Sequence, residues 1–284
     1  IIKNTKVSVE NKEYKVPVFG DTGSIKYRKE YEFKKIDNIV YLKIEKCNYL
    51  NEKQEKEFFD DSDKIIKEFY NADSIVFDFR NNLGGYSKYL EHFTYALIYS
   101  QKTKDNELEF NQWSRSLLAG EKKINTRTMI DKTMSVGLAP SNYYAYCIEN
   151  LGTKYLEEIE YEEVKVIPQY KGKIYILINP LTSSVAEEFT LTLKKLLGQN
   201  VIIVGQNSYG SLDYADIYKY ILPNSKIRIN LCAVDLMNTI LLSEESWHGD
   251  TLGVFPDFWC EPQDIVTTLS KLTGNENILD YIKL

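Results

Sequence analysis

Two short stretches of this sequence carry residue types that together suit acyl transfer. The first is DFRNNLGG, residues 78–85, where a β-branched and aromatic run ends in an Asp-x-Arg step and two adjacent glycines. The second is TSSVAEEF, residues 182–189, where Ser184 follows a similar apolar run. Glycines let the backbone approach a ligand closely, and the N–H groups at a helix start favour negative charge. A serine beside such donors is a candidate nucleophile with an oxyanion hole.

Ordinary structural roles also account for each stretch. Gly84 and Gly85 fit a tight turn from a strand into a helix. Ser184 and Glu187 have the spacing of a capping box, in which a serine at the helix start and a glutamate three residues later exchange hydrogen bonds. In that role Ser184 would still hold its Oγ near the positive end of a helix, with the N–H of Val185 free to stabilise an oxyanion. The residue types alone leave both interpretations open.

The elements that must position these residues alternate between strands and helices. Short, continuously apolar runs are typical of strands buried on both faces of a parallel sheet, and apolar residues three and four apart predict helices. The predicted strands are 39–48, 74–79, 173–179, 201–205, 217–222 and 226–234, and the predicted helices are 51–70, 86–98, 186–197 and 264–272. We therefore expect an α/β fold around a mostly parallel sheet, with both stretches at carboxyl ends of strands, where ligands bind.

Composition argues against several classes of function. The 284 residues are 43% hydrophobic and 27% charged, as in ordinary globular proteins. The net charge of −6 and the lack of long basic runs argue against a protein that binds nucleic acid or anionic membranes. No apolar run reaches the roughly 18 residues of a membrane-spanning helix. Four widely spaced cysteines and two histidines do not fit a common zinc site. Neither a metal nor an organic cofactor is implied by the sequence.

Two segments depart from the alternating pattern. Residues 101–170 are polar and only loosely periodic, which is typical of an inserted lid or substrate-binding segment. The chain begins IIKNTKV without a methionine, which indicates a mature form or a piece of a longer protein. We expect residues 1–38 to be a lead-in from an upstream domain and residues 39–284 to form the main domain.

Four motifs, in this order, resemble those of the carboxy-terminal processing, or tail-specific, serine peptidases. DFRNNLGG resembles the family's Asp-x-Arg-x-Asn-x-Gly-Gly motif, and TSSVAEEF resembles its nucleophile motif, in which the serine lies three residues before a glutamate. VGQNSYG (204–210) is similar to its Gly-x-x-Thr-x-Gly loop, with Ser208 in place of the threonine. LGVFPDFWCEP (252–262) is similar to its Gly-Val-x-Pro-Asp tail.

The resemblance covers residues 39–284, with 101–170 matching poorly. It implies that this part is a serine peptidase catalytic domain with a crotonase-like, Clp-protease-like α/β/α core. It also implies that Ser184 is the nucleophile. The oxyanion donors implied by the resemblance are Gly84 or Gly85, together with Val185.

The catalytic base is where the sequence departs from part of the family. Members of the Ser-Lys type carry a lysine directly after the Gly-x-x-Thr-x-Gly loop, but this chain has Ser211 there. The chain is more similar to the tricorn and retinoid-binding-protein branch, which uses an upstream histidine and an acidic residue near the tail motif. No histidine precedes His92, which we interpret as structural. The base is therefore a histidine before the first residue, which the branch pattern favours, or His248 oriented by Asp250 or Glu245, or it is missing and the chain is a pseudo-enzyme.

The resemblance implies a serine endopeptidase that hydrolyses peptide or protein substrates through an acyl-enzyme on Ser184. Two alternatives remain: a catalytically incomplete module that binds a peptide or glycan, and a crotonase-like hydrolase of other acyl compounds. We expect no nucleic-acid partner and no membrane span, and the oligomeric state is not indicated. The family's common placement favours the cell envelope or the exterior of a bacterium.

Overall fold

The structure, a computed structural model, divides into two compact units, Ile1–Glu30 and Tyr31–Leu284. The first unit contains an antiparallel hairpin of β1 (Ile2–Val9) and β2 (Lys12–Phe19). The unit boundary precedes the predicted one at residue 38, because β3 (Tyr31–Ile36) pairs with the main sheet. The residues that the structure describes are 2–9, 12–19, 29–49, 51–99, 102–117, 124–128, 154–158, 165–222, 224–236 and 241–282.

The second unit is built on a six-stranded sheet in the order β12-β9-β8-β5-β4-β3. Besides β3, its strands are β4 (Ile39–Ile44), β5 (Ser74–Asp78), β8 (Lys173–Ile178), β9 (Val201–Gly205) and β12 (Phe258–Trp259). All neighbouring strands run parallel except β3 and β4, so the predicted mostly parallel sheet is confirmed. Side chains of β5 are buried on both faces, which explains the apolar run Ile75, Val76 and Phe77 at its centre.

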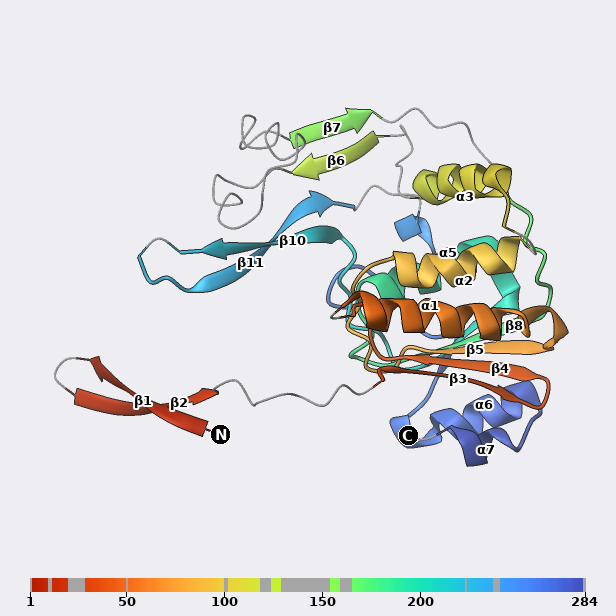
Figure 1. The fold of residues 1–284 in the computed structure, drawn as a ribbon, viewed down its shortest axis with the longest axis horizontal. Coiled ribbons are helices and arrows are strands. Elements are labelled where there is room, and N and C mark those ends of the chain that lie inside the picture. The colour runs from red at the N-terminus through yellow and green to blue at the C-terminus, as the bar shows by residue number, and fades with distance from the viewer. Residues whose placement is uncertain are drawn as a thin grey trace. The chain divides into compact units, whose positions relative to one another are not determined.

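Helices cover both faces of this sheet (Figure 1). One face packs against α1 (Glu52–Ile66), α2 (Lys88–Ile98) and α5 (Val185–Leu197), and the other against α6 (Ile265–Thr273) and α7 (Ile278–Tyr281). Short 3₁₀ turns lie at Phe69–Asn71, Gly198–Asn200, Leu241–Ser243 and Pro262–Asp264. The hydrophobic core on the side of α1, α2 and α5 contains one phenylalanine ring from each of these helices, Phe58, Phe93 and Phe189. Burying such side chains contributes about 1.5–3 kcal/mol each, and the resulting layers form the predicted α/β/α core.

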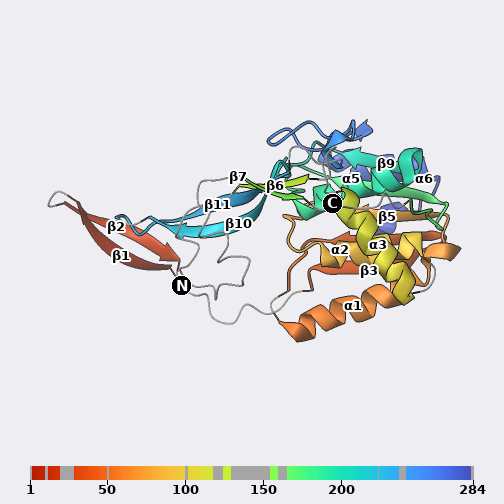
Figure 2. The ribbon, with the colours of Figure 1, turned by 90° about the horizontal axis from the view of Figure 1, so that it is seen from above.

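The predicted insertion contains regular elements of its own. Helix α3 (Lys104–Leu117) packs on α2, where Phe110 and Trp113 meet Ile98 (Figures 1 and 2). A second sheet, in the order β10-β11-β6-β7, joins β6 (Ile124–Thr128) and β7 (Lys154–Glu158) to β10 (Tyr214–Ile221) and β11 (Arg228–Asp235). The strands predicted at 217–222 and 226–234 therefore lie outside the main sheet. Tyr170, at the end of the predicted insertion, is buried in the main core, and much of the remaining segment lies outside the described residues.

None of the helices in the described ranges combines the length and the apolar character needed to cross a bilayer.

Candidate active site

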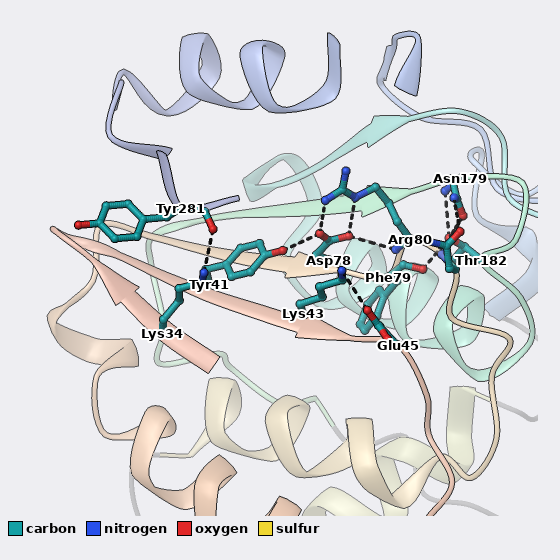
Figure 3. Close-up of polar contacts among 11 residues, drawn as sticks. Lys34, Tyr41, Lys43, Glu45, Asp78, Phe79, Arg80, Asn179, Thr182 and Tyr281 are labelled. Carbon is teal, nitrogen blue, oxygen red and sulfur yellow. Dashed lines mark hydrogen bonds and ion pairs between the residues drawn. The ribbon is translucent and has the colours of Figure 1, made fainter. Parts of the chain in front are cut away.

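The Asp-x-Arg step braces the point where the chain leaves β5 (Figure 3). Asp78 is fully buried and accepts hydrogen bonds from Arg80 Nε at 2.8 Å, Arg80 Nη2 at 2.6 Å and the Tyr41 hydroxyl at 2.7 Å. A buried carboxylate persists only when it is paired in this way. The Thr182 hydroxyl donates to the carbonyl oxygen of Phe79 at 2.9 Å, which ties the same point to the second stretch. The charged step therefore sets the direction of the loop that follows.

Asn82 holds the glycine turn in place from within the fold. Its buried side chain donates from Nδ2 to the carbonyl oxygen of Ile44 at 2.8 Å and accepts from the N–H of Gly84 at 2.7 Å. The backbone carbonyl oxygen of Asn82 accepts a hydrogen bond from the N–H of Ser183 at 2.9 Å. One asparagine thus links the end of β4, the glycine turn and the chain just before α5.

The two glycines are required by close approaches of other chain segments. Gly84 and Gly85 have φ of +86° and +141°, which side chains with a Cβ rarely adopt. A Cβ built on Gly84 would lie 2.7 Å from the Cβ of Ser184 and 3.1 Å from its Oγ. A Cβ built on Gly85 would lie 2.2 Å from the carbonyl oxygen of Cys47. The structure therefore places Ser184 directly against the glycine turn.

Ser184 itself has an unusual backbone conformation at the start of α5. Its φ is +58° and its ψ is −121°, outside the regions that a residue with a Cβ normally occupies. Such a conformation costs about 1–3 kcal/mol and persists only where the surroundings impose it. Here the imposing contacts are the hydrogen bond from the preceding residue to Asn82 and the packing against Gly84.

Two backbone N–H groups next to Ser184 remain available to a ligand. The N–H groups of Gly85 and Val185 donate to no other group among the described residues. By contrast, the N–H of Gly84 is already committed to Asn82. Of the two glycines considered from sequence, Gly85 is thus the one with a free donor. Val185 is the first residue of α5, so its N–H also lies at the positive end of that helix.

Glu187 is a buried hub that connects this region to the loop after β9. Its carboxylate accepts from the N–H of Ser184 at 2.7 Å, which is the glutamate half of the predicted capping box. It also accepts from the Ser208 hydroxyl at 2.5 Å, the Gly210 N–H at 2.7 Å and the Ser211 N–H at 3.1 Å. Burial raises the pKa of Glu187, while these donors act to lower it. The capping-box spacing predicted the bond from Ser184 to Glu187, but not the bonds from the loop after β9 to the same carboxylate.

The tail motif packs against the same loop. A Cβ on Gly253 would lie 2.4 Å from the Oγ of Ser208, which accepts from the N–H of Val254 at 2.6 Å. Asp250 accepts from the N–H groups of Leu212 and Asp213, at 2.8 and 2.9 Å. Its own N–H donates to the Asp213 carboxylate at 3.0 Å. Burial raises the pKa of Asp250, and the charge of Asp213 adds to this.

The structure does not join either histidine to Ser184. The ring of His248 lies on the ring of Phe255, with 3.7 Å between centroids, and its side chain makes no hydrogen bond to another described residue. His92 Nε2 lies 2.9 Å from an oxygen of Asp63, and its ring packs on Phe59, in agreement with a structural role. Burial lowers the pKa of His92.

Ser211 occupies the position at which a Ser-Lys peptidase would carry its lysine. It lies beside Ser183, the residue before the candidate nucleophile. The hydroxyl groups of Ser183 and Ser211 are 2.8 Å apart. Within the described ranges no hydrogen bond connects Ser184 to a lysine, and no cluster of three or more potential metal-ligating side chains occurs. The chemistry that this arrangement suits is attack by a hydroxyl on a carbonyl carbon, with the oxyanion held between two N–H donors.

Comparison with known proteins identifies one family. The sequence model of peptidase family S41 matches residues 38–234. No curated protein matches the chain. Among solved structures, a putative peptidase from Parabacteroides merdae is 17% identical, with 89% of this chain and 62% of that one covered and a TM-score of 0.42. A putative S41 protease from Bacteroides fragilis is 14% identical (95% and 65% covered, TM-score 0.44), and mature CPAF complexed with lactacystin is 16% identical (86% and 52% covered, TM-score 0.43). The chain therefore spans less than two thirds of each of these three structures.

Proposed function

Because the chain belongs to peptidase family S41, we propose that it hydrolyses peptide bonds through an acyl-enzyme formed on Ser184. The family is the one predicted from the four sequence motifs. The observation that supports the proposal is the contact of Ser184 with Gly84 of the glycine turn, whose next residue, Gly85, has an N–H that, like the N–H of Val185, donates to no other described residue. In the proposed reaction the Ser184 Oγ attacks the scissile carbonyl carbon, and the two N–H groups hold the oxygen as it becomes negative. The C–N bond then breaks, the amine leaves with the proton that Ser184 gave up, and water hydrolyses the resulting ester, which frees the acid and restores the serine hydroxyl.

The buried network around Glu187 supports this proposal by holding the site rigid. Oxyanion donors help catalysis only when they are already aimed at the developing charge. Glu187 fixes the N–H of Ser184 and the loop at Gly210 through one carboxylate. Asn82 fixes the glycine turn in the same way, by accepting a hydrogen bond from the N–H of Gly84. Two independent buried side chains thus hold the two helix starts that frame the serine.

A fluorophosphonate probe tests the nucleophile directly, because it forms a covalent bond with activated serines. We expect the wild-type chain to label, Ser184→Ala not to label, and Ser183→Ala to label at a substantial rate. Ser183→Ala is the matched control because it removes the adjacent hydroxyl, which bonds to Ser211. Labelling that survives in Ser184→Ala would refute the assignment. Cleavage of casein, compared with small thioesters, then separates a peptidase from a hydrolase of other acyl compounds.

A peptide-binding module without catalysis is the second candidate, and the surroundings of the serine favour it in one respect. The ring of His248 lies on Phe255, and its side chain is not joined to Ser184 by a hydrogen bond. An alkoxide needs a neighbour that takes its proton, and histidine is the usual choice near neutral pH. If His248, oriented by Asp250 or Glu245, serves as the base, His248→Ala should reduce labelling by several orders of magnitude. Absence of labelling in the wild-type chain would favour the binding module.

A further inference from the structure

A cavity of about 390 Å³, part of it open to solvent, lies where four strands of the main sheet end. Lys43 lines it from β4, Arg80 from the end of β5, Asn179 from the end of β8 and Gln206 from the end of β9. Residues of the segment 260–265, which leads from β12 into α6, form another part of the wall. Ligands of open α/β sheets bind at the carboxyl ends of strands, in sites that typically enclose about 300–1,000 Å³. The position and the volume of this cavity therefore suit a small ligand.

The sheet face beneath α6 changes from apolar to polar as it approaches the cavity. Tyr41 of β4 and Val76 of β5 are buried in the core that α6 covers. Because alternate residues of a strand share a face, the next side chains on the same face are Lys43 and Asp78. The face is therefore apolar where α6 packs on it and charged where it borders the cavity.

The described residues that line the cavity include two cations and no acid. Arg80, at 8% exposure, is bonded to Asp78 through Nε and Nη2, which fixes its guanidinium group on the side of the sheet that α6 covers (Figure 3). Lys43 lies 3.0 Å from Glu45, and both side chains of this ion pair are about one quarter exposed. Such a pair contributes little to stability, so Lys43 can exchange Glu45 for a ligand. Neither Asp78 nor Glu45 lines the cavity, so the charge that faces it is positive.

The wall contributed by the segment 260–265 is mainly apolar. Ile265, the first residue of α6, is buried at 2% exposure, and Cys260 and Pro262 line the cavity beside it. The amide side chains of Gln206 and Gln263 also line it, and an amide can both donate and accept hydrogen bonds. Apolar walls with a few polar groups that fix orientation are typical of small-molecule sites. A ligand that fills this space therefore combines an apolar body with a negative group.

We propose that this cavity binds a small organic carboxylate. Its negative group pairs with Lys43 and lies in the positive field of Arg80, and its apolar body packs on Cys260, Pro262 and Ile265. A free carboxylic acid and the C-terminal residue of a peptide both offer this chemistry. The inference goes beyond the proposed function, because none of these residues belongs to the Ser184 site.

Matched pairs of an acid and its neutral amide test the cavity by calorimetry. We would titrate 4-methylpentanoate, 3-phenylpropanoate and acetyl-leucine, each beside its amide, into the Ser184→Gly protein, which should hydrolyse none of them. The peptide Ala-Ala-Ala-leucine and its amide form a fourth pair. We expect at least one acid to bind about tenfold more tightly than its amide, which corresponds to about 1.4 kcal/mol. A preference confined to the three small acids indicates a free acid as the ligand, whereas equally tight binding of the peptide acid indicates a peptide C-terminus.

Two substitutions in the wall locate the bound acid. In Lys43→Gln the ratio of acid to amide affinity should fall below about threefold, because the pairing cation is gone. Gln206→Glu is nearly isosteric but places a negative charge in the wall, so it should also remove the preference. Lys271→Gln and Gln199→Glu make the same changes at exposed positions outside the cavity and should leave the ratio unchanged. Arg80 is kept, because it neutralises a buried carboxylate whose isolation would destabilise the fold.

Three results would overturn the inference: equal binding of every acid and its amide, no binding of any probe, or an acid preference that persists in either wall variant. The last result would place the acid elsewhere, for instance at the N–H groups of Gly85 and Val185. Thermal unfolding of each variant confirms that it is folded. Failure of the proposed function is seen separately, as absence of hydrolysis by the wild-type chain, and a chain that prefers the acids but cleaves nothing would support the cavity assignment alone.

Discussion

Replacing Ser184 with glycine and with alanine should separate its chemical role from its backbone strain. Both changes remove the Oγ, so both should lower hydrolysis by at least about a thousandfold. They differ in the Cβ, which alanine keeps and glycine lacks. At φ +58° and ψ −121° the Cβ is unfavourable, at a cost of about 1–3 kcal/mol. Glycine removes that cost.

The expected difference in stability follows from two opposing terms. Glycine relieves the strain, but it also gives the unfolded chain more freedom, which costs about 0.4–1 kcal/mol relative to alanine. At the midpoints of these two ranges, Ser184→Gly should be more stable than Ser184→Ala by about 1.3 kcal/mol, which is about 3–5 °C in Tm for a unit of this size. The loss of the hydroxyl is common to both variants and cancels in this comparison. Both variants should therefore be inactive, and the glycine variant should be the more stable of the two.

Thermal unfolding and fluorophosphonate labelling are measured on the same three proteins. Equal Tm values for the alanine and glycine variants would refute the strain argument, because the imposed conformation would then have no cost. A glycine variant that still labels or cleaves would refute Ser184 as the nucleophile. Ser183→Ala serves as the control for both measurements, since it removes one hydroxyl in the same turn and leaves Ser184 in place.

Three further changes have expected outcomes that the same assays check. Glu187→Gln should lower the free energy of unfolding by about 2–4 kcal/mol in chemical denaturation, because an amide group cannot accept all the hydrogen bonds that the carboxylate accepts, and an unchanged midpoint would contradict this. Glu188→Gln should instead raise the free energy of unfolding at pH 8. The pKa of Glu188 is about 7 in the folded state, above the unfolded value of 4.5, so the stability of the wild-type chain is lost as pH rises through 7. The variant should therefore gain at most about 3 kcal/mol at pH 8 and under about 1 kcal/mol at pH 5. A gain that does not depend on pH would exclude titration of Glu188 as its cause. Gly85→Ala should destabilise the fold by several kcal/mol, since its Cβ would lie 2.2 Å from the carbonyl oxygen of Cys47, and a normal melting curve for this variant would show that the turn adapts.

Local features of the sequence were enough to predict the layered α/β fold and the two helix starts. Continuous apolar runs such as SIVF and periodic helix stripes depend only on neighbouring residues, and they predicted β4, β5, β8 and β9 with the helices α1, α2, α5 and α6. The two edge strands β3 and β12 and the short helix α7 were not predicted. The four motifs, read together, also predicted the peptidase family that the family match establishes. Periodicity did not assign β10 and β11 to a second sheet, because strand pairing is not a local property.

What only the tertiary structure decided concerns contacts between residues far apart in the chain. The sequence left Gly84 and Gly85 equivalent as donors, and the hydrogen bond from Gly84 to Asn82 removes one of them. The spacing of Ser184 and Glu187 indicated a cap, whereas the bonds from Ser208 and Gly210 to Glu187 arise only when the loop after β9 folds against α5. Local sequence specifies which elements form, but only the packing of those elements determines which of their polar groups are left for a substrate.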